Sequence, residues 1–329
     1  MFQLNTNDPQ SLTKYLKKRK WLLPAEQICA LSKPGEGNMN YVLRIETGRR
    51  TFILKQSRAY VEKFPHIPAP ANRAIIEGTF YQTIQALPSI QALMPTILGV
   101  DKINNIIVLE DLGTANDYTG LYGFQTALSS NEVIALINYL NLLHGHFRKP
   151  KGSRKMGNMA MRKLNHEHIF HYPFVAENGF DLDLIQPGLQ ALAMTYKTDM
   201  TLKRIVHNIG KIYLGTGDTL LHGDYYPGSW LRTLHGIKII DPEFCFYGPK
   251  EFDVAVMLAH FYMTAQNEDV MESISVNYKL YPSLNSQLLY SFIGVEMMRR
   301  LIGLAHVPLA CDLNRKKELL EKAYTFLTQ

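Results

Sequence analysis

The sequence predicts a two-lobed α+β fold, in which a small antiparallel sheet with one long helix precedes a mostly helical lobe. Before residue 112, short β-like runs alternate with turns that contain Gly or Asn. From about residue 129, apolar residues recur at the helical spacing of three and four. Because 329 residues suffice for two lobes, we expect an N-terminal lobe over residues 1–112 and a C-terminal lobe over residues 113–329.

The N-terminal lobe should begin with a short helix, capped by Asp8 and carrying Pro9 at its first position. The strands are expected at residues 27–33, 42–45, 52–55, 96–100 and 106–109. A longer helix over residues 71–86 separates the third of these strands from the fourth, since its apolar residues recur at helical spacing.

The C-terminal lobe should begin with a helix whose start is marked by a capping box, Ser129 with Glu132. Residues 183–214 are expected to be helical with breaks, and further helices are expected at residues 251–266, 285–305 and 314–327. One β hairpin, between Asp224 and Asp241, interrupts this run of helices.

Composition excludes several classes of protein. A hydrophobic content of 46% and a charged content of 19% are typical of a globular protein. The net charge of +6 suits an anionic partner such as a nucleotide, but it is too small to indicate nucleic-acid binding. No apolar run reaches the length of a membrane span, and no signal peptide is evident. The three cysteines are far apart, so we expect a reducing, cytoplasmic compartment.

Two carboxylates seventeen residues apart carry most of the functional information. Asp224 follows an apolar run and ends the motif His-Gly-Asp, and Asp241 follows a second apolar run and opens the motif Asp-Pro-Glu. Either motif alone is weak evidence. Together, in this order, they match a phosphoryl-transfer loop, in which one Asp faces the attacking hydroxyl and the other holds Mg²⁺.

Residues upstream can supply the nucleotide side of such a site. Lys55 ends a predicted strand and Glu77 borders the apolar face of the next helix, so the two can pair and orient the lysine toward the ATP phosphates. Gly35, Gly37 and Asn38 lie in a loop between strands, where glycines let backbone N–H groups approach phosphate. An ordinary hairpin turn has the same composition.

The segment from the last N-terminal strand to the C-terminal lobe is the expected connector between lobes. Here Glu110 and Leu112 would lie where the adenine bonds to backbone groups. The scattered histidines show no metal-ligand spacing, so we expect structural or surface roles for them. Trp230 is expected to pack in the core beneath the catalytic loop.

Several segments together resemble the methylthioribose kinases, a group of small-molecule kinases related to aminoglycoside phosphotransferases and choline kinase. The matching segments are Gly35-Glu36-Gly37-Asn38-Met39-Asn40, Ile53-Leu54-Lys55-Gln56, Gly223-Asp224, Asp241-Pro242-Glu243-Phe244 and Glu296-Met297-Met298-Arg299-Arg300. The resemblance implies a protein-kinase-like fold that uses ATP and Mg²⁺. It covers the chain in patches, and residues 113–215 show little similarity.

The resemblance also implies roles for individual residues. Asp224 would be the catalytic base, and the magnesium ligands would be Asp241 and Glu243, with Ser229 at a position where many relatives have a metal-binding Asn. Arg299 and Arg300 would face the sugar or the transferred phosphate. The loop departs from the family pattern after Asp224, and its aromatic pair, Tyr225 and Tyr226, would reshape the acceptor pocket, with Tyr225 as the expected substrate contact.

We therefore expect transfer of the γ-phosphoryl group of ATP to a hydroxyl of a small molecule, with methylthioribose or a similar sugar as the leading acceptor. An amino alcohol of the aminoglycoside or choline type is the first alternative, and the acidic segment 177–183 would suit such a cation. A nucleotide-binding pseudokinase scaffold is the second, because Ser229 replaces the usual Asn. Neither nucleic acid nor membrane is an expected partner, and a homodimer is left open.

Overall fold

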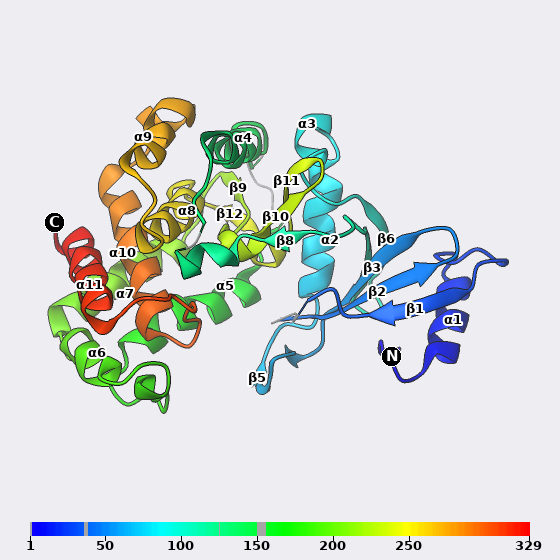
Figure 1. Cartoon of the computed structure of the whole chain (residues 1–329), viewed down its shortest axis with the longest axis horizontal. Helices are drawn as coiled ribbons and strands as arrows, with labels where there is room; N and C mark the ends of the chain where they lie inside the picture. Colours follow the sequence, from blue (N-terminus) through cyan, green and yellow to red (C-terminus); the bar gives the residue numbers. More distant parts are fainter. Residues whose placement is uncertain (1, 36–38, 125, 150–155) are drawn as a thin grey trace. The chain divides into compact units, whose positions relative to one another are not determined.

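The computed structural model describes residues 2–35, 39–124, 126–149 and 156–329, and the chain packs as two units (Figure 1). Unit 1 comprises Met1–Asn116 and Arg232–Phe244, and unit 2 comprises Asp117–Leu231 and Cys245–Gln329. The sequence predicts two lobes that are each one continuous stretch of chain, divided at residue 112. In the structure, the segment with the Asp-Pro-Glu motif packs with unit 1, so unit 1 consists of two stretches of chain. The predicted α+β composition, with an antiparallel sheet in one unit and helices in the other, is confirmed.

Unit 1 is built on a five-stranded antiparallel sheet of order β1-β2-β3-β7-β6. Its strands are β1 (Ile28–Ser32), β2 (Tyr41–Thr47), β3 (Thr51–Gln56), β7 (Ile106–Glu110) and β6 (Ile97–Asp101). In the register of the three central strands, Leu54 of β3 lies opposite Leu43 of β2 and Val108 of β7. These three apolar side chains share one face, because residues directly opposite each other in a sheet point the same way.

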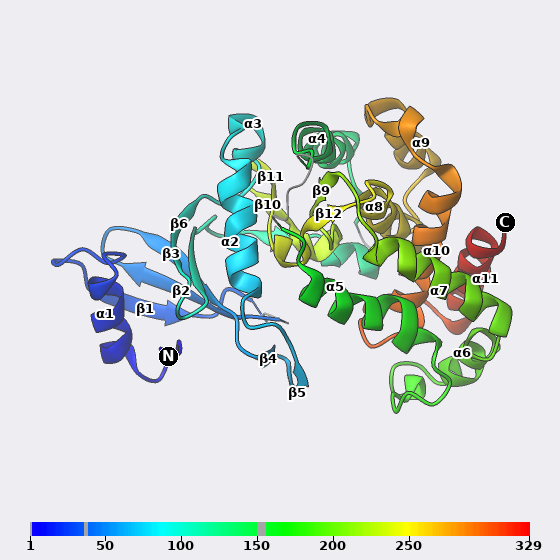
Figure 2. The same ribbon diagram turned by 180° about the vertical axis from the view of Figure 1, so that it is seen from behind.

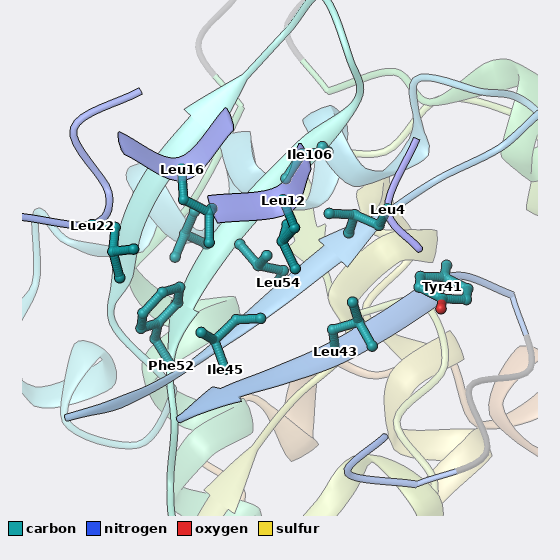
Figure 3. Close-up of a cluster of buried hydrophobic side chains, with 11 residues drawn as sticks. Leu4, Leu12, Leu16, Leu22, Tyr41, Leu43, Ile45, Phe52, Leu54 and Ile106 are labelled. Carbon is teal, nitrogen blue, oxygen red and sulfur yellow. The ribbon is translucent and has the colours of Figure 1, made fainter. Parts of the chain in front are cut away.

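Helix α1 (Pro9–Lys18) covers that face of the sheet. Asp8 caps the helix by accepting a hydrogen bond from Ser11 N, as predicted. Leu12 and Leu16 of α1 are fully buried against the sheet, and Figure 3 shows them gathered with Leu54. Burying a leucine contributes about 1.5–3 kcal/mol, so α1 is held by its apolar side rather than by its own helix propensity.

Helix α2 (Arg73–Ile84) packs against β6 and β7. It lies within the segment for which the sequence predicts a helix. Gly78 permits the close approach, because a Cβ there would lie 3.0 Å from Ile107 Cγ2. Helix α2 also packs against the short helical turn Pro242–Phe244, so the Asp-Pro-Glu motif is anchored on the same unit as Glu77.

The remaining elements of unit 1 are short. They are β4 (Tyr60–Val61), β5 (Phe64–Pro68), α3 (Pro88–Gln91) and β11 (Gly236–Ile239). The chain passes between the units within or next to β8 (Asn116–Asp117) and β10 (Trp230–Thr233), and again after residue 244.

Unit 2 is mostly helical. Its helices are α4 (Ser130–His146), α5 (Met159–His166), α6 (Leu189–Lys197), α7 (Met200–Leu214), α8 (Glu251–Met263), α9 (Glu268–Asn277), α10 (Ser286–Ile302) and α11 (Leu313–Thr328). Helix α8 is buried along almost its whole length, and α10 packs against both α8 and α11 (Figure 2). Two short strands, β9 (Thr219–Leu221) and β12 (Phe246–Gly248), pair antiparallel within this unit.

The helix ends follow local sequence signals. The capping box of Ser129 and Glu132 forms at the start of α4, as predicted. The breaks predicted in the helical segment 183–214 are confirmed: Gly188 adopts a left-handed conformation before α6, and Asp199 caps α7. No helix among the described residues is long and apolar enough to cross a membrane.

We expect Leu12→Ala to lower the free energy of unfolding by about 2–5 kcal/mol, because it opens a cavity between α1 and the sheet. Urea denaturation followed by circular dichroism measures this change. Lys14→Ala, on the exposed side of the same helix, is the control and should stay within about 0.5 kcal/mol of wild type. Equal effects of the two substitutions would show that α1 is not docked through Leu12.

Candidate active site

Unit 1 holds a buried cluster centred on Lys55, at the end of β3. Lys55 Nζ lies 2.9 Å from Glu77 Oε1 and 2.7 Å from Asp241 Oδ1. Strand β3 directs the lysine toward α2, which presents Glu77 from its buried side. The pairing of Lys55 with Glu77 expected from the sequence is therefore present, and Asp241 is brought to the same lysine.

The charges in this Lys55 cluster are not balanced by its lysine alone. Burial would lower the pKa of Lys55, but the carboxylates of Asp241, Glu77 and Glu243 outweigh burial and raise it. Burial raises the pKa of Glu77 to about 8 and also raises the pKa of Glu243. An additional cation at this cluster would relieve the crowding of carboxylates.

Asp241 and Glu243 occupy different environments, although only one residue separates them. Asp241 adopts a left-handed backbone conformation (φ 62°), which Asp tolerates better than most residues, and its side chain is 49% exposed. Glu243 is buried, accepts a hydrogen bond of 2.8 Å from Asn40 Nδ2 and lies 3.7 Å from Arg73 Nε. One carboxylate is thus accessible, and the other is held in place by unit 1 itself.

Arg73 links the cluster to the nucleotide loop expected from the sequence. Its fully buried guanidinium group donates hydrogen bonds to the backbone carbonyl groups of Arg58, Pro70, Met39 and Tyr60. Met39 is the first residue described after that loop. Arg73 and Asn40 therefore fix the end of the loop relative to Glu243. Neither residue was assigned a role from the sequence, although an arginine at the first position of an apolar helix is a recognisable signal.

The residues of the cluster fit a magnesium ion that arrives with a nucleotide. Asp241 and Glu243 supply the hard carboxylate oxygens that Mg²⁺ prefers, and the buried Asn40 Oδ1 has no hydrogen-bond partner among the described residues. Across the described ranges, no group of three or more His, Cys, Asp or Glu side chains could hold a metal alone. Mg²⁺ usually completes its shell with phosphate and water, which suits this small set of donors.

Unit 2 holds a second cluster, centred on Asp224 at the end of β9. The loop that carries Asp224 is fixed by Asp253 of α8, which is fully buried. Asp253 accepts hydrogen bonds from His222 N at 2.7 Å and Gly223 N at 2.9 Å, and it lies 3.1 Å from His144 Nε2. Gly223 has a φ of +88°, so the turn requires glycine there. His144 has the structural role expected of the histidines.

The structure corrects the prediction that Tyr225 lines an acceptor pocket. Tyr225 is fully buried, stacks on Tyr139 with ring centroids 5.3 Å apart, and donates its hydroxyl to Leu136 O. Trp230 is fully buried beside it, as predicted. The neighbouring Tyr226 faces the other way, and the guanidinium carbon of Arg300 lies 4.5 Å from its ring centre. Sequence could not distinguish which tyrosine points to the core.

Ser229 shapes the same loop. It ends the turn Pro227–Ser229, is buried, and donates its hydroxyl to Asp224 O at 2.9 Å. This bond holds the backbone that carries the Asp224 carboxylate. The hydroxyl oxygen keeps lone pairs, so the role of Ser229 as a metal ligand stays a prediction.

Both arginines of the Glu-x-x-Arg-Arg motif bind the carboxylate of Asp224. Arg299 Nη2 lies 3.0 Å and Arg300 Nη2 lies 2.8 Å from the same oxygen, Asp224 Oδ1. Glu296 pairs with the Nε groups of both arginines. Burial would raise the pKa of Glu296, but the two guanidinium groups hold it well below its usual value. Both arginines therefore bind the Asp224 carboxylate, a contact that the sequence did not reveal.

His260 of α8 extends this network on the side of Glu296. Its Nε2 lies 3.3 Å from Glu296 Oε1, and its Nδ1 lies 2.9 Å from the hydroxyl oxygen of Tyr122. Burial lowers the pKa of His260 to about 4, so the imidazole is neutral near pH 7. In the tautomer that satisfies both contacts, Tyr122 donates to Nδ1 and Nε2–H donates to Glu296.

The other described residues that the sequence predicts at the nucleotide do not belong to the Lys55 cluster. Gly35 follows β1, and a Cβ built on it would meet open space. Gly37 and Asn38 lie outside the described residues. Glu110 accepts a hydrogen bond from Thr96 N through its carboxylate, and Leu112 is half-buried. Nucleotide binding by these residues stays a prediction.

A model of the phosphotransferase enzyme family matches residues 214–283, the segment that carries Asp224, Asp241 and Asp253. The chain is also 30% identical over 241 residues to a methylthioribose kinase of Exiguobacterium sibiricum, an alignment that covers 70% of this chain and 60% of that relative. In this segment and over most of its length, the chain is similar to phosphotransferases of this family. The family resemblance expected from the sequence is confirmed.

Other relatives extend the similarity over most of the chain. A methylthioribose kinase of Geobacillus sp. (strain WCH70) is 26% identical over 350 residues, which cover 93% of this chain and 86% of the relative. Among solved structures, a choline kinase from Cryptosporidium parvum matches with a TM-score of 0.58 at 13% identity, over 97% of this chain and 96% of that one. The structural match confirms the predicted kinase-like fold, and the named relatives support the prediction of a small-molecule kinase.

We expect acid to destabilise the protein through His260. Its pKa is about 4 in the folded protein and about 6.5 in the unfolded chain, so the unfolded chain binds more protons between these values. Folding stability should therefore fall as the pH is lowered from 6.5 to 4, by on the order of 3 kcal/mol from this residue. Urea denaturation at several pH values measures the loss.

His260→Gln should be less stable at pH 7 but should lose less stability on acidification, because a titrating group has been removed. The matched control is His146→Gln on α4, since His146 is exposed. It should keep the wild-type dependence on pH. Parallel curves for wild type and His260→Gln would contradict this assignment.

Proposed function

We propose that the protein transfers the γ-phosphoryl group of ATP to a hydroxyl of a small molecule, and that the acceptor is methylthioribose or a similar sugar. The observation that carries the proposal is that hydrogen bonds from the described residues reach one oxygen of the Asp224 carboxylate and not the other. Asp224 Oδ1 binds Arg299 and Arg300, whereas no hydrogen bond from any described residue reaches Oδ2. A rigid loop thus presents one carboxylate oxygen, which suits the orientation of an attacking hydroxyl.

The Lys55 cluster supplies the nucleotide side of the reaction. Lys55, directed by Glu77, would bind phosphate oxygens of ATP, with Asp241 and Glu243 as the protein ligands of Mg²⁺. The ion would neutralise charge on the phosphates. Binding of Mg–ATP would also relieve the excess of carboxylates that raises the pKa values of Glu77 and Glu243. The predicted cofactors, ATP and Mg²⁺, both suit these residues.

The Asp224 cluster favours a sugar over an amino alcohol. Two guanidinium groups face the carboxylates of Asp224 and Glu296, so no surplus negative charge is left to attract a cationic acceptor. Two relatives that align with this chain at 26–30% identity are named methylthioribose kinases. A sugar hydroxyl, unlike an ammonium group, can accept hydrogen bonds from arginine as well as donate to Asp224.

The proposal also includes a reducing, cytoplasmic compartment, because the three cysteines are free. The homodimer left open by the sequence remains a prediction.

Coupled ADP release across a panel of acceptors tests the proposal. The panel contains methylthioribose, ribose, choline and an aminoglycoside, each with Mg–ATP. We expect the highest kcat/KM on methylthioribose or a related sugar. Asp224→Asn should lower kcat on that acceptor by about 10²–10⁴-fold, with Mg–ATP affinity measured by calorimetry staying near the wild-type value.

Two results would count against this assignment. If choline or the aminoglycoside is phosphorylated efficiently and neither sugar is, the acceptor is an amino alcohol and not a sugar. If Asp224→Asn keeps the wild-type kcat on the preferred acceptor, Asp224 is not the catalytic base.

Asp241→Ala should show the opposite pattern. The loss of an accessible carboxylate from the Lys55 cluster should weaken Mg–ATP binding at least tenfold in calorimetry, because Mg²⁺ takes only one or two carboxylates from protein. Glu26→Gln is the matched control, since Glu26 is a buried carboxylate of unit 1 that pairs with Arg50 instead. Unchanged Mg–ATP affinity in Asp241→Ala would refute the metal-binding role.

A further inference from the structure

We infer that Glu296 is a positioning residue for the acceptor side of the reaction: it holds both guanidinium groups on Oδ1 of Asp224 and thereby keeps Oδ2 open for the acceptor hydroxyl. This inference rests on the proposed function. Glu296 is only 1% exposed, so it acts through the arginines and not by touching a substrate.

The geometry of α10 makes the arrangement possible. Glu296, Arg299 and Arg300 are spaced i, i+3 and i+4, so their side chains emerge on neighbouring turns of one face. Arg299 donates to Glu296 through Nε and through Nη2, the latter at 3.1 Å. Arg300 donates Nε to Glu296 Oε1 at 2.8 Å. One carboxylate therefore fixes the Nε side of both guanidinium groups.

This attachment leaves each arginine with one donor directed at Asp224. Because Nε of each guanidinium is bound to Glu296, neither arginine can present its Nε–Nη2 edge to Asp224 as a fork. Each contributes a single Nη2 group, and both Nη2 groups meet at Oδ1. An arginine released from Glu296 would be free to bind both oxygens of Asp224, which is the preferred geometry of an arginine–carboxylate pair.

Charge leads to the same expectation. Arg299 and Arg300 are 4% and 7% exposed, so two nearly desolvated cations lie side by side. Glu296 and Asp224 together balance them. Without the negative charge of Glu296, Asp224 would be the only carboxylate in the described part of the chain that pairs with either arginine, and both guanidinium groups would be drawn further onto it.

Other contacts lock Glu296 and Arg300 in this arrangement. His260 Nε2 bonds to Glu296 Oε1, and Tyr122 in turn bonds to His260 Nδ1. The Arg300 guanidinium carbon lies 4.5 Å from the ring centre of Tyr226. The orientation of the arginines is therefore set before an acceptor arrives, as preorganised catalysis requires.

The test is Glu296→Gln, which keeps the shape of the side chain and removes its charge. We expect kcat/KM for methylthioribose to fall about 10–10²-fold, mainly through a higher KM, because an arginine fork on Asp224 competes with the acceptor for Oδ2. The KM for Mg–ATP should stay within about twofold. Glu296→Asp, which keeps the charge but shortens the reach, should recover part of the loss.

Glu251→Gln is the matched control. Glu251 is also a buried glutamate of unit 2, but it accepts a hydrogen bond from Asn285 N and belongs to neither cluster. A structural effect of removing a buried charge would appear in both variants as a lower melting temperature. Only Glu296→Gln should raise the KM for the sugar without raising the KM for Mg–ATP.

A second measurement does not depend on the substrate. The Nε–H resonances of Arg299 and Arg300 in ¹⁵N NMR report their bonds to Glu296, and both should shift in Glu296→Gln but not in Glu251→Gln. If wild type phosphorylates no sugar while these resonances shift, the proposed function fails and the positioning of the arginines stands. Unchanged resonances, or an equal rise in KM for both substrates, would overturn the inference.

If Glu296→Gln does not fold, the same measurements on Glu296→Asp decide, with smaller effects of the same sign expected.

Discussion

The loop that carries Asp224 depends on a single buried carboxylate, Asp253. A desolvated carboxylate is costly unless donors surround it, and here it is met by two backbone N–H groups, His222 N and Gly223 N, and by the imidazole of His144. The loop therefore has one favourable conformation. That conformation sets the direction of Asp224, and it sends Tyr225 into the core, so that Tyr226 is left on the side of the arginines.

The two clusters differ in their balance of charge, and each balance suits a different ligand. In the Lys55 cluster the carboxylates outnumber the lysine, and burial raises the pKa values of Glu77 and Glu243. That excess suits a site whose ligand brings a divalent cation. In the Asp224 cluster two guanidinium groups are matched by two carboxylates. That balance suits a neutral, hydroxyl-rich acceptor.

The sequence predicted the residues whose chemistry is tied to a local pattern. Lys55, Glu77, Asp224 and Asp241 each follow or border an apolar run, and the structure places each at the end or on the buried side of an element. Asp253 and Arg73 were assigned no role from the sequence, because most of their partners are backbone groups far away along the chain. Tyr225 was assigned wrongly because adjacent aromatic residues in a turn give no periodicity from which a direction can be read.

The polar residues of α10 are better explained by chemistry than by stability. The helix is buried along most of its length, and the residues next to these polar ones on it, Ile293, Val295, Met297 and Met298, are buried apolar side chains. In such surroundings a buried ion network contributes little to folding, and apolar residues of similar volume are often neutral or stabilising replacements. Stability alone therefore gives no reason for Glu296, Arg299 and Arg300 to lie there. The role proposed for Asp224 does, because charged donors on one helix can hold one of its oxygens and leave the other accessible.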